Sequence, residues 1–258
     1  MSQDPFATSR PASSPAGTPA PWSLGATIAW SVAGLFAWGA AQFVVIAIYM
    51  ATYRKAGDAA AVEALGTNGF LIAIVTIVAS PAWIAVMVLA SRRRGWHAAD
   101  YLALVVPTRG QLVFGLVCTL PLLAAFDVLT YATGRDVVPP FMSESYKSAA
   151  SSGSLLLFLI AMVFIAPVAE EIVFRGFLFR GLRASFLGVA GTLVVTSVAW
   201  ALMHVQYDWA GIVQIFLIGL LLGWLRWASG STLLTIVLHV MANFIALVET
   251  AIWVEWLG

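Results

Sequence analysis

Long apolar runs separated by short polar segments dominate the chain from residue 22 onward. A bilayer core about 30 Å thick needs about 20 apolar residues per helix, so each long run predicts a membrane-spanning helix. The pattern therefore predicts an all-α, polytopic transmembrane helical bundle of about seven spans, and one helix missed by this pattern would make eight. The predicted spans cover residues 24–50, 70–89, 112–133, 155–174 or beyond, 187–205, 211–227 and 232–248.

The first 21 residues differ from the rest because they are rich in Pro, Ser, Ala and Thr and contain no apolar run. Such a segment buries too little apolar surface to offset the entropy lost on ordering. We therefore expect a disordered tail over residues 1–21 and a transmembrane domain over residues 22–258. The tail also lacks the continuous apolar core of a secretory signal.

The composition agrees with membrane residence. Of 258 residues, 61% are hydrophobic and 10% are charged, whereas soluble domains carry about 25% charged residues. Most of the surface must therefore face lipid, which makes the bilayer the first expected partner. The net charge of +1 gives no reason to expect nucleic acid as a partner. Cys118 is the only cysteine, so no internal disulfide forms.

The Lys and Arg residues are divided unequally between the two sides of the predicted bundle. With a cytoplasmic N-terminus, nine of the 13 fall in cytoplasmic segments and four on the other side. The positive-inside rule then favours a cytoplasmic N-terminus. The cytoplasmic set is Arg10, Arg92, Arg93, Arg94, Arg109, Arg175, Arg180, Arg183 and Arg226, and the other set is Arg54, Lys55, Arg135 and Lys147.

Three short motifs place polar side chains inside the predicted spans. A charged group at the bilayer centre costs at least about 2.5 kcal/mol, so such residues are candidates for function. Two of the three histidines of the chain lie in these motifs. The motifs are Glu170-Glu171-Ile172-Val173-Phe174-Arg175, Trp200-Ala201-Leu202-Met203-His204 and His239-Val240-Met241-Ala242-Asn243.

The two adjacent glutamates have different expected roles. Glu171 and Arg175 are four residues apart with the acid first, which is the favourable order for an ion pair on a helix. Glu170 is rotated by about 100° from Glu171 and points away from Arg175. A carboxyl group without a local partner in an apolar setting suits a general acid or base. The alternative is a buried salt bridge beside an acid that reaches the membrane surface.

The histidines of the other two motifs also have two interpretations. His239 and Asn243 share one helix face and are suited either to donate hydrogen bonds to an oxyanion or to hold neighbouring helices together. His204 is either part of a reactive site or a structural histidine near the end of a span.

A depth comparison bears on whether Glu170 and His204 meet. If the fourth helix continues through 176–183, Glu170 lies ~20 Å along it from Arg183. His204 lies ~25 Å from Leu187 along the next helix, which runs back. The two side chains then reach similar depths. If the fourth helix ends at Arg175, the depths differ and no pair forms.

The order of the three motifs on successive helices resembles the CPBP family, the CAAX-protease and bacteriocin-processing (Abi) group of intramembrane endopeptidases. The resemblance covers about residues 155–248. Trp200 stands where phenylalanine is common in that family. Each motif alone is weakly specific, and their order and spacing together carry the resemblance.

The resemblance implies an enzyme, a peptidase that is often labelled a metalloprotease, in the bacterial plasma membrane. Its substrate would be a membrane-associated peptide or protein. It also implies three pairs with separate roles: a water-activating pair, a supporting pair and an oxyanion-stabilising pair. By position these are Glu170 with His204, Glu171 with Arg175, and His239 with Asn243.

Some alternatives stay open at this point. A glutamate and two histidines are able to bind Zn²⁺, but the sequence has no His-Glu-x-x-His motif, and a metal-free mechanism fits the residues as well. A non-enzymatic bacteriocin-immunity or scaffold protein would carry the same fold. A transporter would use Glu170, Glu171 and Asp127 as a proton pathway. If the protein is not a transporter, we expect Asp127 to contact a buried polar partner.

Overall fold

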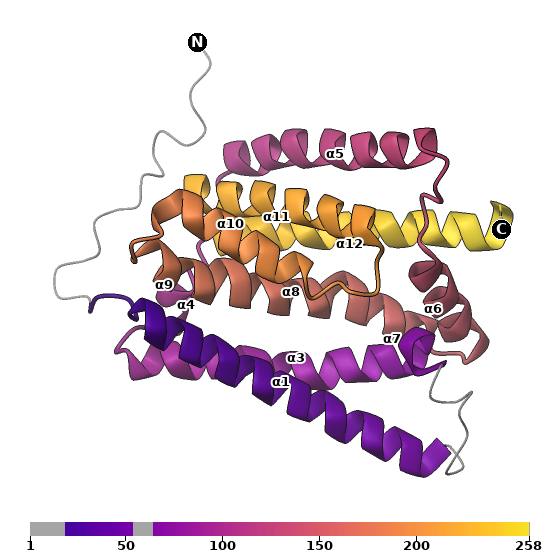
Figure 1. The fold of residues 1–258 in the computed structure, drawn as a ribbon, viewed down its shortest axis with the longest axis horizontal. Helices are drawn as coiled ribbons and strands as arrows, with labels where there is room; N and C mark the ends of the chain where they lie inside the picture. Colours follow the sequence, from indigo (N-terminus) through magenta and orange to yellow (C-terminus); the bar gives the residue numbers. More distant parts are fainter. Residues whose placement is uncertain (1–18, 54–63, 258) are drawn as a thin grey trace.

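The computed structural model of the protein describes residues 19–53 and 64–257, and within these ranges it contains helices and no strands (Figure 1). The predicted all-α polytopic bundle is confirmed. The helices are α1 Leu24–Tyr53, η1 Ala64–Thr67, α3 Gly69–Arg93, α4 Ala98–Tyr101, α5 Arg109–Ala132, α6 Pro140–Ser151, α7 Leu155–Ile160, η2 Ala161–Ile165, α8 Ala166–Glu171, η3 Ile172–Leu178, α9 Phe179–Arg183, α10 Gly188–Ala201, α11 Trp209–Ser229, α12 Thr232–Ile252 and η4 Trp253–Leu257.

Among the described residues, six helices are long and apolar enough to cross a membrane, and they match six of the seven predicted spans. The predicted span 187–205 differs, because α10 has only 14 residues and is about 21 Å long at 1.5 Å per residue. It ends at Ala201, and the chain then turns through residues 202–208. Asp208 caps the next helix by accepting a hydrogen bond from the Gly211 N–H at 2.9 Å.

The helices lie in layers around one central helix (Figure 1). α1 runs along α3 on one side of the bundle. The segment from α7 to α9 occupies the middle and packs against α3, α10 and α12. α5 lies on the opposite side from α1, where it contacts α11 and α12.

The central helix is continuous from Leu155 to Arg183, so the condition for Glu170 and His204 to reach similar depths is met. Two π-helical segments, η2 and η3, interrupt its α-helical hydrogen bonding. At their ends the Ala166 N–H bonds to the Ala161 carbonyl and the Phe179 N–H bonds to the Phe174 carbonyl. Such segments occur often at functional sites. The short turn α8 between them carries both glutamates.

The predicted tail lies outside the described residues except for residues 19–21, which rest on the end of α3. The Arg94 Nε donates to the Ala20 carbonyl at 2.8 Å, and the Trp22 indole donates to the Ala90 carbonyl at 3.0 Å. Three of the basic residues used to orient the chain, Arg10, Arg54 and Lys55, also lie outside the described residues. The cytoplasmic location of the N-terminus stays a prediction.

The sequence pattern did not predict α6, because this helix of 12 residues is too short and too polar for a span. It starts with Pro140 in its first turn, where the missing N–H of proline costs no hydrogen bond. Met142 and Tyr146 are buried on its inner side. Its Ser148 hydroxyl accepts from the Gly69 N–H at 3.1 Å, which ties α6 to the start of α3.

Candidate active site

The buried ion pair of the first motif forms as the sequence predicts. Arg175 Nη1 donates to Glu171 Oε1 at 2.9 Å, and both side chains are 0% exposed. Arg175 Nη2 also donates to the Gly219 carbonyl at 3.3 Å. The guanidinium carbon lies 4.5 Å from the centroid of the Trp200 ring. The charge of Arg175 is therefore compensated by a carboxylate, a carbonyl and an aromatic face.

Glu170 points in a different direction, as its place on the helix predicts. Its side chain is 19% exposed. Its Oε2 accepts a hydrogen bond from the Trp200 indole N–H at 2.6 Å and lies 4.0 Å from His239 Nε2. Glu170 is thus the member of the glutamate pair that is open to the interior cavity.

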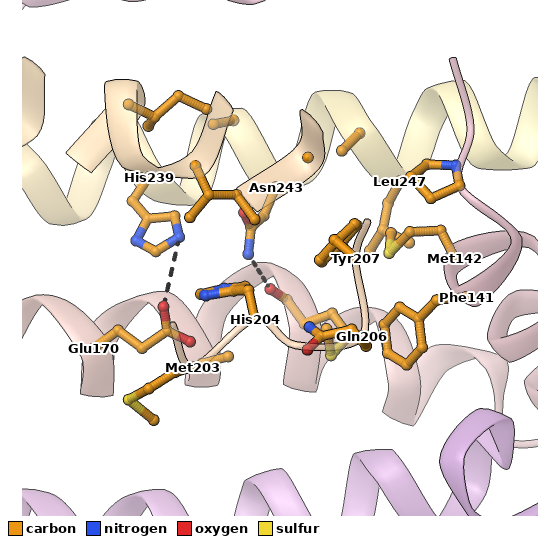
Figure 2. A pocket seen from close by; sticks show the side chains of 18 of the residues that line it. Phe141, Met142, Glu170, Met203, His204, Gln206, Tyr207, His239, Asn243 and Leu247 are labelled. Carbon is orange, nitrogen blue, oxygen red and sulfur yellow. Dashed lines mark hydrogen bonds and ion pairs between the residues drawn. The ribbon is translucent and has the colours of Figure 1, made fainter. Parts of the chain in front are cut away.

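His239 lies between the two glutamates. Its Nδ1 is 3.0 Å from Glu171 Oε1, and because Glu171 also pairs with Arg175, this contact is Nδ1–H donating to an ionised carboxylate. The second nitrogen, Nε2, points toward Glu170, and Figure 2 shows this contact from α12 to the central helix. A ring that carries both protons would donate from Nε2 into the cavity.

His204 follows the end of α10 and is held by the backbone. Its Nδ1 is 2.9 Å from the Trp200 carbonyl. A carbonyl only accepts, so Nδ1 carries the proton. The neutral ring then keeps a lone pair on Nε2, the atom that is able to accept a hydrogen bond from water. The labelled close-up places His204 between the helix of Glu170 and the helix of Asn243 (Figure 2).

Asn243 uses one of its two amide protons on the central helix. Its Nδ2 donates to the Met162 carbonyl at 2.9 Å (Figure 2). The Met162 carbonyl does not receive the backbone hydrogen bonds usual in a helix. The Ala166 N–H bonds to the Ala161 carbonyl instead, and Pro167 has no N–H. The π segment and the proline therefore create the acceptor that orients Asn243. The second amide proton is left for another acceptor.

One cavity of about 500 Å³ joins these groups. Glu170, His204, His239 and Asn243 all border it, while much of its remaining wall is apolar and comes from α1, α3, α5, α6 and α11. Glu171 and Arg175 do not border this cavity, whereas Asp127 does. The depth comparison left open whether Glu170 and His204 would meet, and their place on one cavity is a finding of the tertiary structure.

Two further residues border the cavity and were not among the predicted site residues. Trp200 differs from the phenylalanine common in the CPBP family, and an aromatic residue four positions before His204 on a helix shares its face. Tyr207 lies in the turn that follows α10. Burial, with a smaller contribution from the negative charge of Glu170, raises the pKa of Tyr207 to about 12. Its hydroxyl is therefore a neutral phenol at ordinary pH.

The site residues do not fit a metal centre. Among the described residues, no group of three or more His, Cys, Asp or Glu side chains is arranged to hold a metal ion. A catalytic zinc site needs three protein ligands. We therefore derive no chemical step through a metal.

Comparisons with known proteins agree with the motif order. Residues 152–245 match the family described as "Type II CAAX prenyl endopeptidase Rce1-like". The chain is also 31% identical over 111 residues to an uncharacterized 24.3 kDa protein of Escherichia coli. That alignment covers 42% of this chain and 50% of the relative, so the chain spans about half the length of the curated relative it matches. No solved structure matches the chain.

The matched region includes the central helix, α10, α11 and most of α12, and it carries all six candidate residues. The resemblance to the CPBP family is thus confirmed over this region. Residues 152–245 of this chain are similar to the type II CAAX prenyl endopeptidases of the Rce1-like family.

Proposed function

We propose that this protein is an intramembrane endopeptidase in which Glu170 and His204 activate a water molecule for peptide-bond hydrolysis. The observation that carries the proposal is the convergence of Glu170, His204, His239 and Asn243 on one cavity. These residues come from three separate helical regions, and packing alone gives no reason to bring their polar atoms together. The match to CAAX prenyl endopeptidases supports a membrane-associated peptide as the substrate class.

In the first step, the water lies between the Glu170 carboxylate and His204 Nε2. Glu170 removes a proton while the water oxygen attacks the carbonyl carbon of the scissile bond. General-base catalysis of this kind is typically worth 10²–10⁴-fold in rate. His204 suits the orienting role, because its Nδ1–H is fixed on the Trp200 carbonyl at 2.9 Å.

The attack turns the substrate carbonyl oxygen into an oxyanion. His239 Nε2 and the second amide proton of Asn243 are the donors on the α12 side of the cavity that would stabilise it. Donors of this type are worth about 2.7–4 kcal/mol each in the barrier. The proton held by Glu170 then passes to the leaving nitrogen as the C–N bond breaks. The products are an amine and a carboxylic acid, which releases its remaining proton to solvent, and Glu170 returns to its ionised form.

The test is cleavage of a farnesylated CAAX peptide by the purified protein in liposomes, followed by mass spectrometry of the released fragment. Glu170→Ala and His204→Ala should each lower the rate at least about 10²-fold. Glu144→Ala is the matched control, because Glu144 is an exposed acid on α6 that does not border the cavity. It should cleave at the wild-type rate.

A second assay does not require a substrate to be chosen in advance. Membranes from cells that produce the wild type or Glu170→Ala are compared for new peptide termini by quantitative proteomics. Cleavage products that depend on Glu170 would support the proposal. A biological effect that survives Glu170→Ala would instead indicate a non-enzymatic membrane protein with the same fold.

A further inference from the structure

Trp200 contacts more of the candidate site than its place in the motif suggests. Its indole N–H donates to Glu170 Oε2 at 2.6 Å, and its ring lies edge-to-face 5.2 Å from the rings of both His204 and His239. The guanidinium carbon of the buried Arg175 lies 4.5 Å from its ring centroid. Trp200 is 3% exposed. Trp200 therefore contacts both Arg175 of the buried ion pair and Glu170 at the cavity.

The indole N–H has a chemical consequence that a phenylalanine at this position would not have. The contact fixes Oε2, so that Glu170 Oε1 is the oxygen left to receive a proton from water. The positive charge of Arg175 over the ring attracts π-electron density, which strengthens the N–H as a donor.

Several other titratable groups lie near Glu170. His239 on α12 and the turn residues His204 and Tyr207 lie on the cavity side. On the central helix itself, Glu171 and Arg175 form their own ion pair. α3 also packs against α8, and its side chains at the cavity include no titratable group. In this setting the indole is the donor in direct hydrogen-bond contact with Glu170.

We propose that Trp200 is a positioning residue that holds Glu170 oriented for water activation through its indole N–H. This inference rests on the proposed function, in which Glu170 is the general base. It predicts that kcat depends on the N–H itself and not only on the volume of the ring.

The test is Trp200→Phe, with kcat and KM measured for cleavage of the farnesylated peptide. The variant should lose roughly tenfold in kcat with KM near the wild-type value, because the general base is no longer held in place by the N–H. A kcat equal to that of the wild type would show that the N–H has no role in the reaction. That result would overturn the proposal.

A matched control is Trp83→Phe. Trp83 on α3 is 3% exposed and borders the same cavity, but within the described part of the chain its indole nitrogen has no hydrogen-bond partner. Its loss of kcat should then be smaller than that of Trp200→Phe. If Trp200→Phe does not fold, benzothienylalanine at position 200 retains the ring size and removes only the N–H, and it should reproduce the loss of kcat.

Infrared spectroscopy separates this inference from the proposed function. The carboxylate stretch of Glu170, identified by its loss in Glu170→Gln, is compared between the wild type and Trp200→Phe. Loss of the indole hydrogen bond should shift this band, whether or not the probe peptide is cleaved. Equal bands would overturn the role of Trp200, whereas failure of cleavage with a shifted band would overturn only the proposed function.

Discussion

Two neighbouring glutamates on one short helical turn meet very different surroundings. Glu171 is 0% exposed and shares one oxygen between Arg175 at 2.9 Å and His239 at 3.0 Å. Glu170 is 19% exposed, faces the cavity and receives a hydrogen bond from Trp200. The rotation of about 100° between adjacent helical residues is enough to separate the two environments.

The difference shows how one helix in a membrane bundle carries both a buried ion pair and a carboxylate that faces a cavity. A buried charge is tolerated when it is paired and hydrogen-bonded, and Glu171 meets this requirement on the side away from the cavity. Its oxygen also accepts a hydrogen bond from His239, which borders the cavity. The proposed function therefore assigns stability and chemistry to different faces of this helix. Each prediction below tests this division.

The largest effect on stability is expected from Glu171→Gln. The change leaves Arg175 as an unpaired buried cation, and breaking a buried ion pair in this way costs about 3–5 kcal/mol. Unfolding of the detergent-solubilised protein by heat or denaturant measures the loss. Glu170→Gln should leave stability near that of the wild type while it abolishes cleavage. Equal destabilisation by both changes would contradict the division between the two faces.

The double variant Glu171→Gln with Arg175→Met sharpens the same comparison. It removes both charges, so the stability lost in the single variant should largely return. Cleavage should stay low, because His239 has lost the carboxylate that orients it. Recovery of both properties together would mean that Glu171 acts only through stability.

Asn243→Ala is expected to have a smaller effect, confined to the reaction. It removes an oxyanion donor, which should lower kcat by about 10²–10³-fold with little change in KM. The stability cost should be near 1–3 kcal/mol, because the Met162 carbonyl loses its side-chain donor. A variant with normal kcat would show that Asn243 only holds α12 against the central helix.

The smallest effect is expected from metal removal. The described histidines and acids do not form a group of three or more that would hold a metal ion. Dialysis against EDTA or phenanthroline should therefore leave cleavage of the farnesylated peptide unchanged. Loss of activity that returns with added Zn²⁺ would show that a metal takes part in the reaction.

The sequence predicted a large part of this arrangement because the relevant patterns are local. The apolar runs predicted six helices that match the observed candidate spans, since length and hydrophobicity decide membrane crossing. The spacing of Glu171 and Arg175 predicted their ion pair, which forms at 2.9 Å. The position of Glu170, one residue earlier, predicted that it would face elsewhere.

Other features depend on contacts between distant segments. The shortness of α10 and the helix α6 follow from how those segments pack, not from apolar length. The π segments around the glutamates give no clear sequence signal apart from Pro167. The acceptor for Asn243 arises from them, because they leave the Met162 carbonyl available.

The sequence by itself determined that this is a membrane helical bundle, which residues are chemically equipped, and which of the two glutamates is locally paired. Periodicity and hydrophobicity are properties of a single segment, so these conclusions need no neighbours. Only the tertiary structure decided that Glu170, His204, His239 and Asn243 share one cavity and that Trp200 donates to Glu170. Such contacts join residues 30 or more positions apart, and their geometry is set by how whole helices pack.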